Sequence, residues 1–138
     1  MGAADLGGEE RRMQVTEYDV GGFELQSDVY VPSSIVLLSK SAYLWRPRRI
    51  EDITPESLRI FTVLHPRPEI VFLGLGAASR RLSPEITKGL EEEGISVEQM
   101  DTGNAVHTFN ILNEEMREIG AALLTPEPRE EYRDPFEI

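Results

Sequence analysis

The sequence predicts a single three-layer α/β domain with a mixed central sheet, in which N-terminal antiparallel strands precede a β-α-β-α-β unit. Three observations support this prediction. An apolar run at 69–76 lies between prolines and glycines, as is typical of a short strand buried on both faces. Helical and strand-like patterns then alternate up to residue 124, as in parallel α/β proteins. Before the run, the connections are too short for parallel crossovers, which predicts antiparallel strands.

The N-terminal part of the domain is predicted to be extended. Gly21-Gly22 is a turn signal, and Phe23-Glu24-Leu25 alternates apolar and polar side chains, so 14–25 is expected to be extended chain with a kink. Three further short apolar segments follow at 29–31, 34–38 and 42–45. We interpret all of these segments as strands or extended chain that pair locally.

Three helices are predicted, and two of them begin with the same kind of triplet. Thr54-Pro55-Glu56 and Ser83-Pro84-Glu85 each combine an N-cap hydroxyl, a proline at the first helical position and a carboxylate in the first turn. Gly94 is expected to end the second helix. The third helix is predicted over 104–114. The strands expected around the last two helices are 69–76, which we place at the centre of the sheet, 95–100 and 119–124.

The predicted domain extends from residue 13 to residue 127. Residues 1–12 lack apolar periodicity and are expected to form a mobile leader. Residues 128–138 are expected to be an acidic tail, because the triplet Thr125-Pro126-Glu127 is followed by charges and prolines without an apolar stripe. The leader is acidic and glycine-rich, so it does not have the basic character of a mitochondrial presequence.

Composition excludes several classes of function. The chain has 138 residues and a net charge of -11, from 25 acidic and 14 basic side chains. This charge opposes binding to nucleic acid and to anionic membrane surfaces. The absence of cysteine excludes disulfides, thiol catalysis and cysteine zinc sites. No apolar run approaches the ~20 residues of a membrane span, so any membrane association is expected to be peripheral and mediated by protein partners.

Few residues are candidates for catalysis or ligand binding. Gly74-Leu75-Gly76 follows a strand and resembles part of a dinucleotide-binding turn, but Ser79 replaces the third glycine and the next helix begins late. A structural turn is favoured there, and a small nucleotide-linked enzyme is kept as the alternative function. His65 and His107 are interpreted as structural, since neither belongs to a set at metal-ligand spacing. We therefore predict no catalytic residue, cofactor or metal.

The segment 101–110, Asp-Thr-Gly-Asn-Ala-Val-His-Thr-Phe-Asn, resembles the most characteristic part of a known family. That family comprises small α/β domains and includes mitochondrial complex I assembly factor 3. Its bacterial and other eukaryotic branches have no established activity. Further matches to the family, which together cover about 15–126, are Gly21-Gly22-Phe23, Trp45, 52–58, 68–70, 73–76 and 121–124.

The resemblance implies a fold and a role. It implies a three-layer α/β domain and a non-catalytic part in building NADH:ubiquinone oxidoreductase. The implied location is the mitochondrion, on the matrix side and associated with the inner membrane. The implied partners are another complex I assembly factor and complex I subunits.

Two basic segments are candidates for docking such a partner. Arg46, Arg48 and Arg49 follow Trp45, and arginine and tryptophan are enriched in binding hot spots. Arg80 and Arg81 follow the turn at Gly74-Leu75-Gly76, which we call the glycine turn. They come after the carboxyl end of the central strand, where open α/β sheets place their binding sites. The alternative is that these arginines face solvent and offset the acidic excess. Docking is favoured for the first segment, and the alternatives are equal for the second. We interpret Asn104 and Asn110 as structural.

Overall fold

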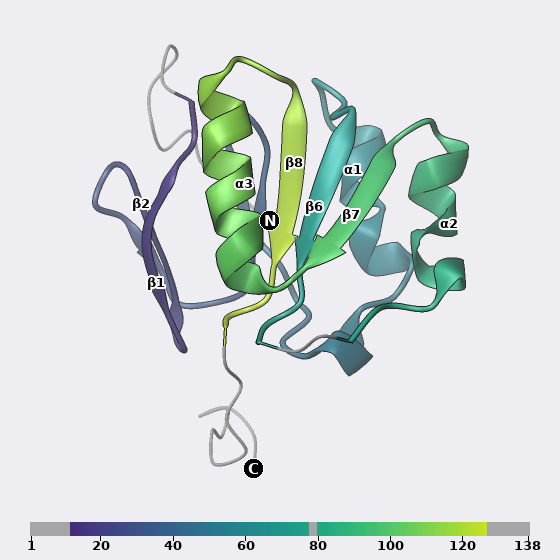
Figure 1. The fold of residues 1–138 in the computed structure, drawn as a ribbon, viewed down its shortest axis with the longest axis horizontal. Coiled ribbons are helices and arrows are strands. Elements are labelled where there is room, and N and C mark those ends of the chain that lie inside the picture. The colour runs from purple at the N-terminus through teal and green to yellow at the C-terminus, as the bar shows by residue number, and fades with distance from the viewer. Residues whose placement is uncertain (1–11, 78–79, 127–138) are drawn as a thin grey trace.

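The computed structural model describes residues 12–77 and 80–126, and most of the predicted leader and the whole predicted tail lie outside this range (Figure 1). The helical elements of this part of the chain include two short 3-10 helices. The strands are β1 (Val15–Asp19), β2 (Gly22–Leu25), β3 (Tyr30–Val31), β4 (Ile35–Leu37), β5 (Ala42–Leu44), β6 (Ile70–Gly74), β7 (Ser96–Met100) and β8 (Ile119–Leu123). The helices are η1 (Ile50–Asp52), η2 (Glu56–Leu58), α1 (Ile60–Val63), α2 (Pro84–Glu92) and α3 (Thr102–Glu114).

The strands form two sheets. A small antiparallel sheet has the order β1-β2-β3, and a mixed five-stranded sheet has the order β5-β4-β8-β6-β7. Within the mixed sheet, β6 is parallel to both β7 and β8, whereas β4 is antiparallel to β5 and β8. The predicted mixed α/β sheet is confirmed. The placement of β6 at its centre is wrong, because β4 pairs with the far side of β8 and makes β8 the middle strand.

The mixed sheet is the middle of three layers. Helix α3 covers one face, with the small sheet beside it, and α1 and α2 cover the other (Figure 1). Side chains along β6 alternate between the two faces of the sheet. Phe72 packs into the core under α3, whereas Val71 and Leu73 pack into the core under α1 and α2. The apolar run that predicted a strand buried on both faces is thereby confirmed.

The turn signal at Gly21-Gly22 is confirmed: β1 and β2 form a hairpin whose connection is Val20-Gly21, and Gly22 is the first residue of β2. A Cβ atom on Gly22 would collide with the backbone carbonyl of Val31, so the close approach of β3 requires a residue without a side chain. Asp19 accepts hydrogen bonds from the N–H groups of Gly21 and Gly22 at 2.9 and 3.0 Å, and from the Tyr30 hydroxyl at 2.9 Å. The hairpin is thus closed by one carboxylate.

The first predicted helix is shorter than its sequence pattern suggested. Thr54 Oγ1 accepts a hydrogen bond from the N–H of Ser57 at 3.1 Å, but the turn that follows is the 3-10 helix η2, and α1 adds only four residues. The backbone of Leu64 already has an extended conformation, and Pro66 follows two residues later. Because a residue before proline is disfavoured in the helical region, the segment leading to Pro66 has little room for a longer helix.

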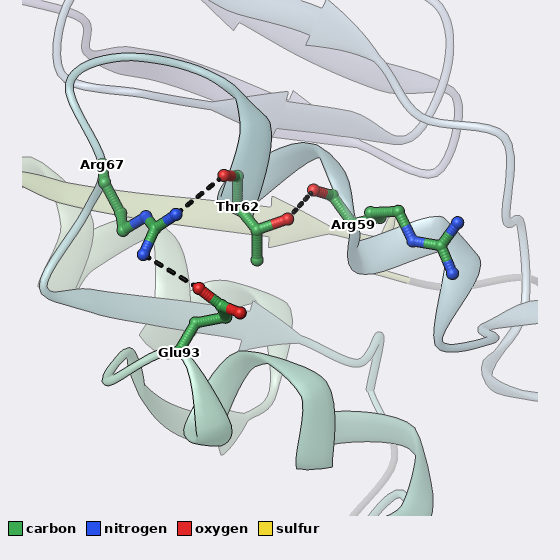
Figure 2. A network of polar contacts seen from close by, with 4 residues as sticks. All are labelled: Arg59, Thr62, Arg67 and Glu93. Carbon is green, nitrogen blue, oxygen red and sulfur yellow. Dashed lines mark hydrogen bonds and ion pairs between the residues drawn. The ribbon is translucent and has the colours of Figure 1, made fainter.

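A surface network links this short helix to the end of α2 (Figure 2). The Arg67 guanidinium donates to the Thr62 carbonyl at 3.0 Å and pairs with the Glu93 carboxylate at 3.1 Å. Thr62 in turn donates its hydroxyl to the Arg59 carbonyl at 2.8 Å. Arg67 therefore satisfies a carbonyl in the last turn of α1 and joins the ends of the two helices.

Helix α3 is held by amide side chains that are partly or fully buried. Asn110 accepts from the Val15 N–H at 3.0 Å and donates to the Val15 carbonyl at 2.9 Å, so one side chain binds the first residue of β1. Asn113, fully buried, donates to the carbonyls of Met13 and Ser39, each at 2.9 Å. Arg12, assigned to the leader by its sequence, donates to the Asn113 carbonyl at 2.7 Å. Arg12 therefore already contacts the domain.

Candidate docking site

The glycine turn is built into the junction of three strands. A Cβ atom on Gly74 would lie 2.9 Å from a Leu123 methyl carbon and 3.0 Å from the Thr102 Cα atom, so α3 can approach β6 closely only at a glycine. Gly76 has a φ of +79°, which a glycine adopts without strain. The turn thus lets the start of α3 sit directly on the ends of β6 and β8.

Thr102 connects the ends of these strands. Its buried hydroxyl accepts a hydrogen bond from the Gly76 N–H at 2.9 Å and donates to the Leu124 carbonyl at 2.7 Å. The N–H of Leu75 donates to the Met100 carbonyl at 2.9 Å. The amides of the turn are therefore used within the fold, and they are the groups that a dinucleotide-binding turn would offer to phosphate. This geometry supports the structural interpretation of the turn.

The start of α3 is occupied by a carboxylate. Asp101 accepts from the Asn104 N–H at 2.7 Å and from its side-chain amide at 3.0 Å. The structural roles expected for Asn104 at a helix entrance and for Asn110 at a neighbouring backbone are confirmed, although Asn110 binds a strand and not a loop. A negatively charged cap opposes the binding of a phosphate at this helix end.

The structure brings the two predicted basic segments together. The Arg80 guanidinium pairs with the Glu51 carboxylate at 2.7 Å, which links the segment after the glycine turn to η1 and the arginines before it. The hydrogen bond from Arg80 holds the pKa of the Glu51 carboxyl below its ordinary value. Both side chains are more than half exposed, so this pair lies at the protein surface.

A second carboxylate shapes the same region. Asp52 accepts hydrogen bonds from the backbone N–H groups of Arg48 and Arg49, at 3.2 and 3.1 Å. These bonds turn the chain into η1 and leave the side chains of Arg46 and Arg49 exposed. We call this region the arginine surface, and its basic members are Arg46, Arg48, Arg49, Arg80 and Arg81. It lies at the end of the sheet where β6 and β8 finish (Figure 1).

Trp45 does not belong to this surface. Its side chain is 5% exposed and packs in the core under α1 and α2, and its indole N–H donates to the Ser57 carbonyl at 2.8 Å. The expectation that the indole is available to a partner is therefore wrong for this structure. Alternation along the strand explains the result, since Trp45 faces the sheet's own core while Arg46 faces outward.

Sequence reasoning missed the acidic members of the site. Neither Glu51 nor Asp52 was among the candidate site residues, yet one pairs with Arg80 and the other accepts hydrogen bonds from two backbone N–H groups. Asp52 follows Arg49 by three residues and Arg48 by four. An aspartate at this spacing can accept hydrogen bonds from the preceding backbone N–H groups, so the sequence does contain a signal for this local turn. Nothing in the sequence indicates the Arg80–Glu51 pair, because tertiary structure alone brings these segments together.

Within residues 12–77 and 80–126, no cluster of three or more His, Asp or Glu side chains is placed to bind a metal ion. His65 and His107 are exposed. Among the same residues, no helix is both long enough and apolar enough to span a membrane.

Comparison with known proteins identifies relatives that match most of this chain. A family model described as "Protein of unknown function (DUF498/DUF598)" matches residues 15–124. The chain is 40% identical over 115 residues to NADH dehydrogenase [ubiquinone] 1 alpha subcomplex assembly factor 3 of Bos taurus, covering 83% of this chain and 61% of that protein. The chain spans about three fifths of the length of the curated relatives that it matches.

Solved structures show the same architecture. A crystal structure of a Bordetella parapertussis protein superposes with a TM-score of 0.74 at 31% identity, covering 83% of this chain and 96% of that one. A solution structure from Bordetella pertussis, described as a Mth938-like domain, has a TM-score of 0.73 at 26% identity and covers 91% and 93%. The protein therefore belongs to the DUF498/DUF598 family, the family of small α/β domains that its sequence resemblance indicated.

Proposed function

We propose that this protein is a non-catalytic assembly factor that helps to build mitochondrial respiratory complex I by binding other proteins. The name of its bovine relative, which is 40% identical over 115 residues, supports this role. We further propose a location in the mitochondrial matrix, peripheral to the inner membrane. The proposed partners are another complex I assembly factor and complex I subunits.

The observation that carries the docking proposal is the Arg80–Glu51 pair, which merges two basic segments into one arginine surface. The chain as a whole has a net charge of -11, so a local basic surface contrasts with the rest of the molecule. Charge contrast of this kind orients a partner and excludes partners of the wrong sign. We therefore propose that the arginine surface binds an acidic surface of the partner.

A pull-down from mitochondria tests this proposal with the Arg49→Glu, Arg81→Glu double variant. Both side chains are exposed, and neither makes the ion pair of Arg80, so their reversal leaves the link between the segments in place. We expect recovery of complex I subunits or assembly factors to fall about tenfold or more, while the free energy of unfolding changes by less than ~0.5 kcal/mol.

The matched control is the Lys40→Glu, Lys88→Glu double variant, which changes the net charge equally. Lys40 is exposed next to Ser39, whose hydroxyl donates to Glu118 at the opposite end of β8. Equal loss of recovery in both variants would mean that overall charge, and not the arginine surface, governs binding. Saturable binding of NAD, NADP or ATP in a calorimetric titration would instead favour the nucleotide-linked alternative.

A further inference from the structure

Strand β5 forms a free edge of the mixed sheet directly before the arginine surface. Its ladder to β4 pairs Ile35 with Leu44 and Leu37 with Ala42, and no strand of the described chain flanks its other side. Hydrogen bonds from Trp45 N–H to the Ser34 carbonyl, at 3.0 Å, and from Leu38 N–H to the Ser41 carbonyl extend this ladder. The extended edge therefore runs from Ser41 to at least Trp45.

The backbone of Leu44 faces away from β4. In an antiparallel ladder, alternate residues direct their N–H and C=O groups toward the same neighbour. Because Trp45 and Ser41 bond to the β4 side, the N–H and C=O groups of Leu44 point to the free side. The Leu44 side chain is 71% exposed, although it is a large apolar group in a strand. Both the backbone groups and the side chain of Leu44 can therefore contact a strand placed beside β5.

Leu44 and Arg46 occupy the same face of this edge. Ala42 packs in the core under α3, whereas Tyr43 and Trp45 pack against the core under α1 and α2. By alternation, Leu44 and Arg46 lie on the α3 side, two positions apart. An apolar group followed by a cation at that spacing is matched by a strand with an apolar residue opposite Leu44 and a carboxylate opposite Arg46.

From this arrangement we infer that the partner binds as an added strand on the free edge of β5. This inference rests on the proposed function and names its partner chemistry: an extended segment with an acidic and an apolar residue two positions apart. Backbone hydrogen bonds to Leu44 supply affinity, and the pairs with Leu44 and Arg46 supply specificity. Pro47 has no N–H with which to continue the ladder to β4, so the strand that offers this edge ends there.

Fluorescence anisotropy with a labelled synthetic peptide of repeating Glu-Thr-Val-Thr tests the inference. This repeat presents the required spacing in both strand directions. We expect saturable binding, and about tenfold weaker binding of a peptide of repeating Lys-Thr-Val-Thr. In the protein, Leu44→Pro removes the outward N–H and the side chain, whereas Leu44→Ala removes only most of the side chain. We expect the Pro variant to bind about tenfold more weakly than the Ala variant.

A second comparison leaves the protein unchanged and so does not depend on the folding of the Pro variant. Backbone N-methylation of the Glu-Thr-Val-Thr peptide removes its donors, and we expect it to abolish binding to the wild-type protein. Binding that survives methylation but is lost in Arg46→Gln would show charge attraction alone and would overturn strand addition. A dimer of the free protein in sedimentation that Leu44→Pro converts to a monomer would assign the edge to a second copy, and would also overturn the inference.

The two proposals can fail separately. If Arg49→Glu with Arg81→Glu abolishes recovery of complex I proteins while Leu44→Pro does not, the arginine surface docks the partner without an added strand. If neither variant reduces recovery, the docking proposal fails together with the inference.

Discussion

The two faces of the mixed sheet are held in different ways. On the α3 face, amide side chains bind backbone groups: the partly buried Asn110 binds Val15, and the fully buried Asn113 binds Met13 and Ser39. On the α1 and α2 face, the helices are short. The buried Trp45 indole donates to the Ser57 carbonyl, and exposed ion pairs join Arg67 to Glu93 and Arg80 to Glu51. A buried hydrogen bond costs a great deal when it is broken, whereas an exposed ion pair is screened by water and salt.

The difference between the two faces indicates which part of the molecule is rigid and which contacts a partner can replace. Helix α3 is bound to both sheets, so we expect it to behave as part of the scaffold. The arginine surface is held to the domain by an exposed pair, Arg80 with Glu51, whose charges can exchange with those of a partner at little cost. The ion pair that joins the two basic segments thus lies on the loosely held face, whereas Leu44 and Arg46 at the free edge of β5 lie on the α3 side.

The largest expected effect comes from the core under α3. Phe72 is 2% exposed in β6, and Phe72→Ala should lower the free energy of unfolding by ~3–5 kcal/mol because it removes a large buried ring. Chemical denaturation measures this value. Val63→Ala is the control, since Val63 is 65% exposed on α1 and should change stability by less than ~0.5 kcal/mol. A cost below ~1 kcal/mol for Phe72→Ala would show that the α3 face is not a close-packed core.

An intermediate effect should separate the two kinds of polar contact. Asn113→Ala leaves the Met13 carbonyl without its side-chain donor and should cost ~1–3 kcal/mol. Arg67→Ala removes the exposed pair with Glu93 and should cost less than ~1 kcal/mol, with a smaller effect at high salt. Denaturation at low and high salt measures both values. Equal costs, or a strong salt dependence for Asn113→Ala, would remove the distinction between the faces.

The smallest effect concerns the titration of Glu51. Its pKa in the folded protein is lowered from the ordinary value of 4.5 by the hydrogen bond from Arg80. A lowered folded-state pKa means that the pair contributes to stability above the unfolded-state pKa and that this contribution is lost as pH falls through the folded-state pKa. NMR titration of the Glu51 carboxyl should show its pKa rise toward 4.5 in Arg80→Gln. An unchanged pKa would mean that the pair does not form in solution.

Much of the fold could be predicted from local patterns. The run at 69–76 predicts a strand because its apolar side chains alternate between two cores, and Ser83-Pro84-Glu85 predicts the start of α2 because helix ends have local chemical requirements. Gly94 ends that helix region with a φ of +84°, as a glycine after a helix is expected to do. The residues that carry the family resemblance at 101–110 have structural roles, since Thr102 and Asn110 use their side chains to join backbone segments that are distant in the sequence.

Local patterns and composition are enough to predict the class of fold, the starts of two helices and the excess of negative charge, because each depends on neighbouring residues or on residue counts. The central position of β8, the burial of Trp45 and the pairing of Arg80 with Glu51 follow from contacts between segments that are distant in the sequence. Strand order depends on which segments pair across long stretches of chain. Local periodicity reports whether a side chain alternates inward or outward, but not which distant segment covers it.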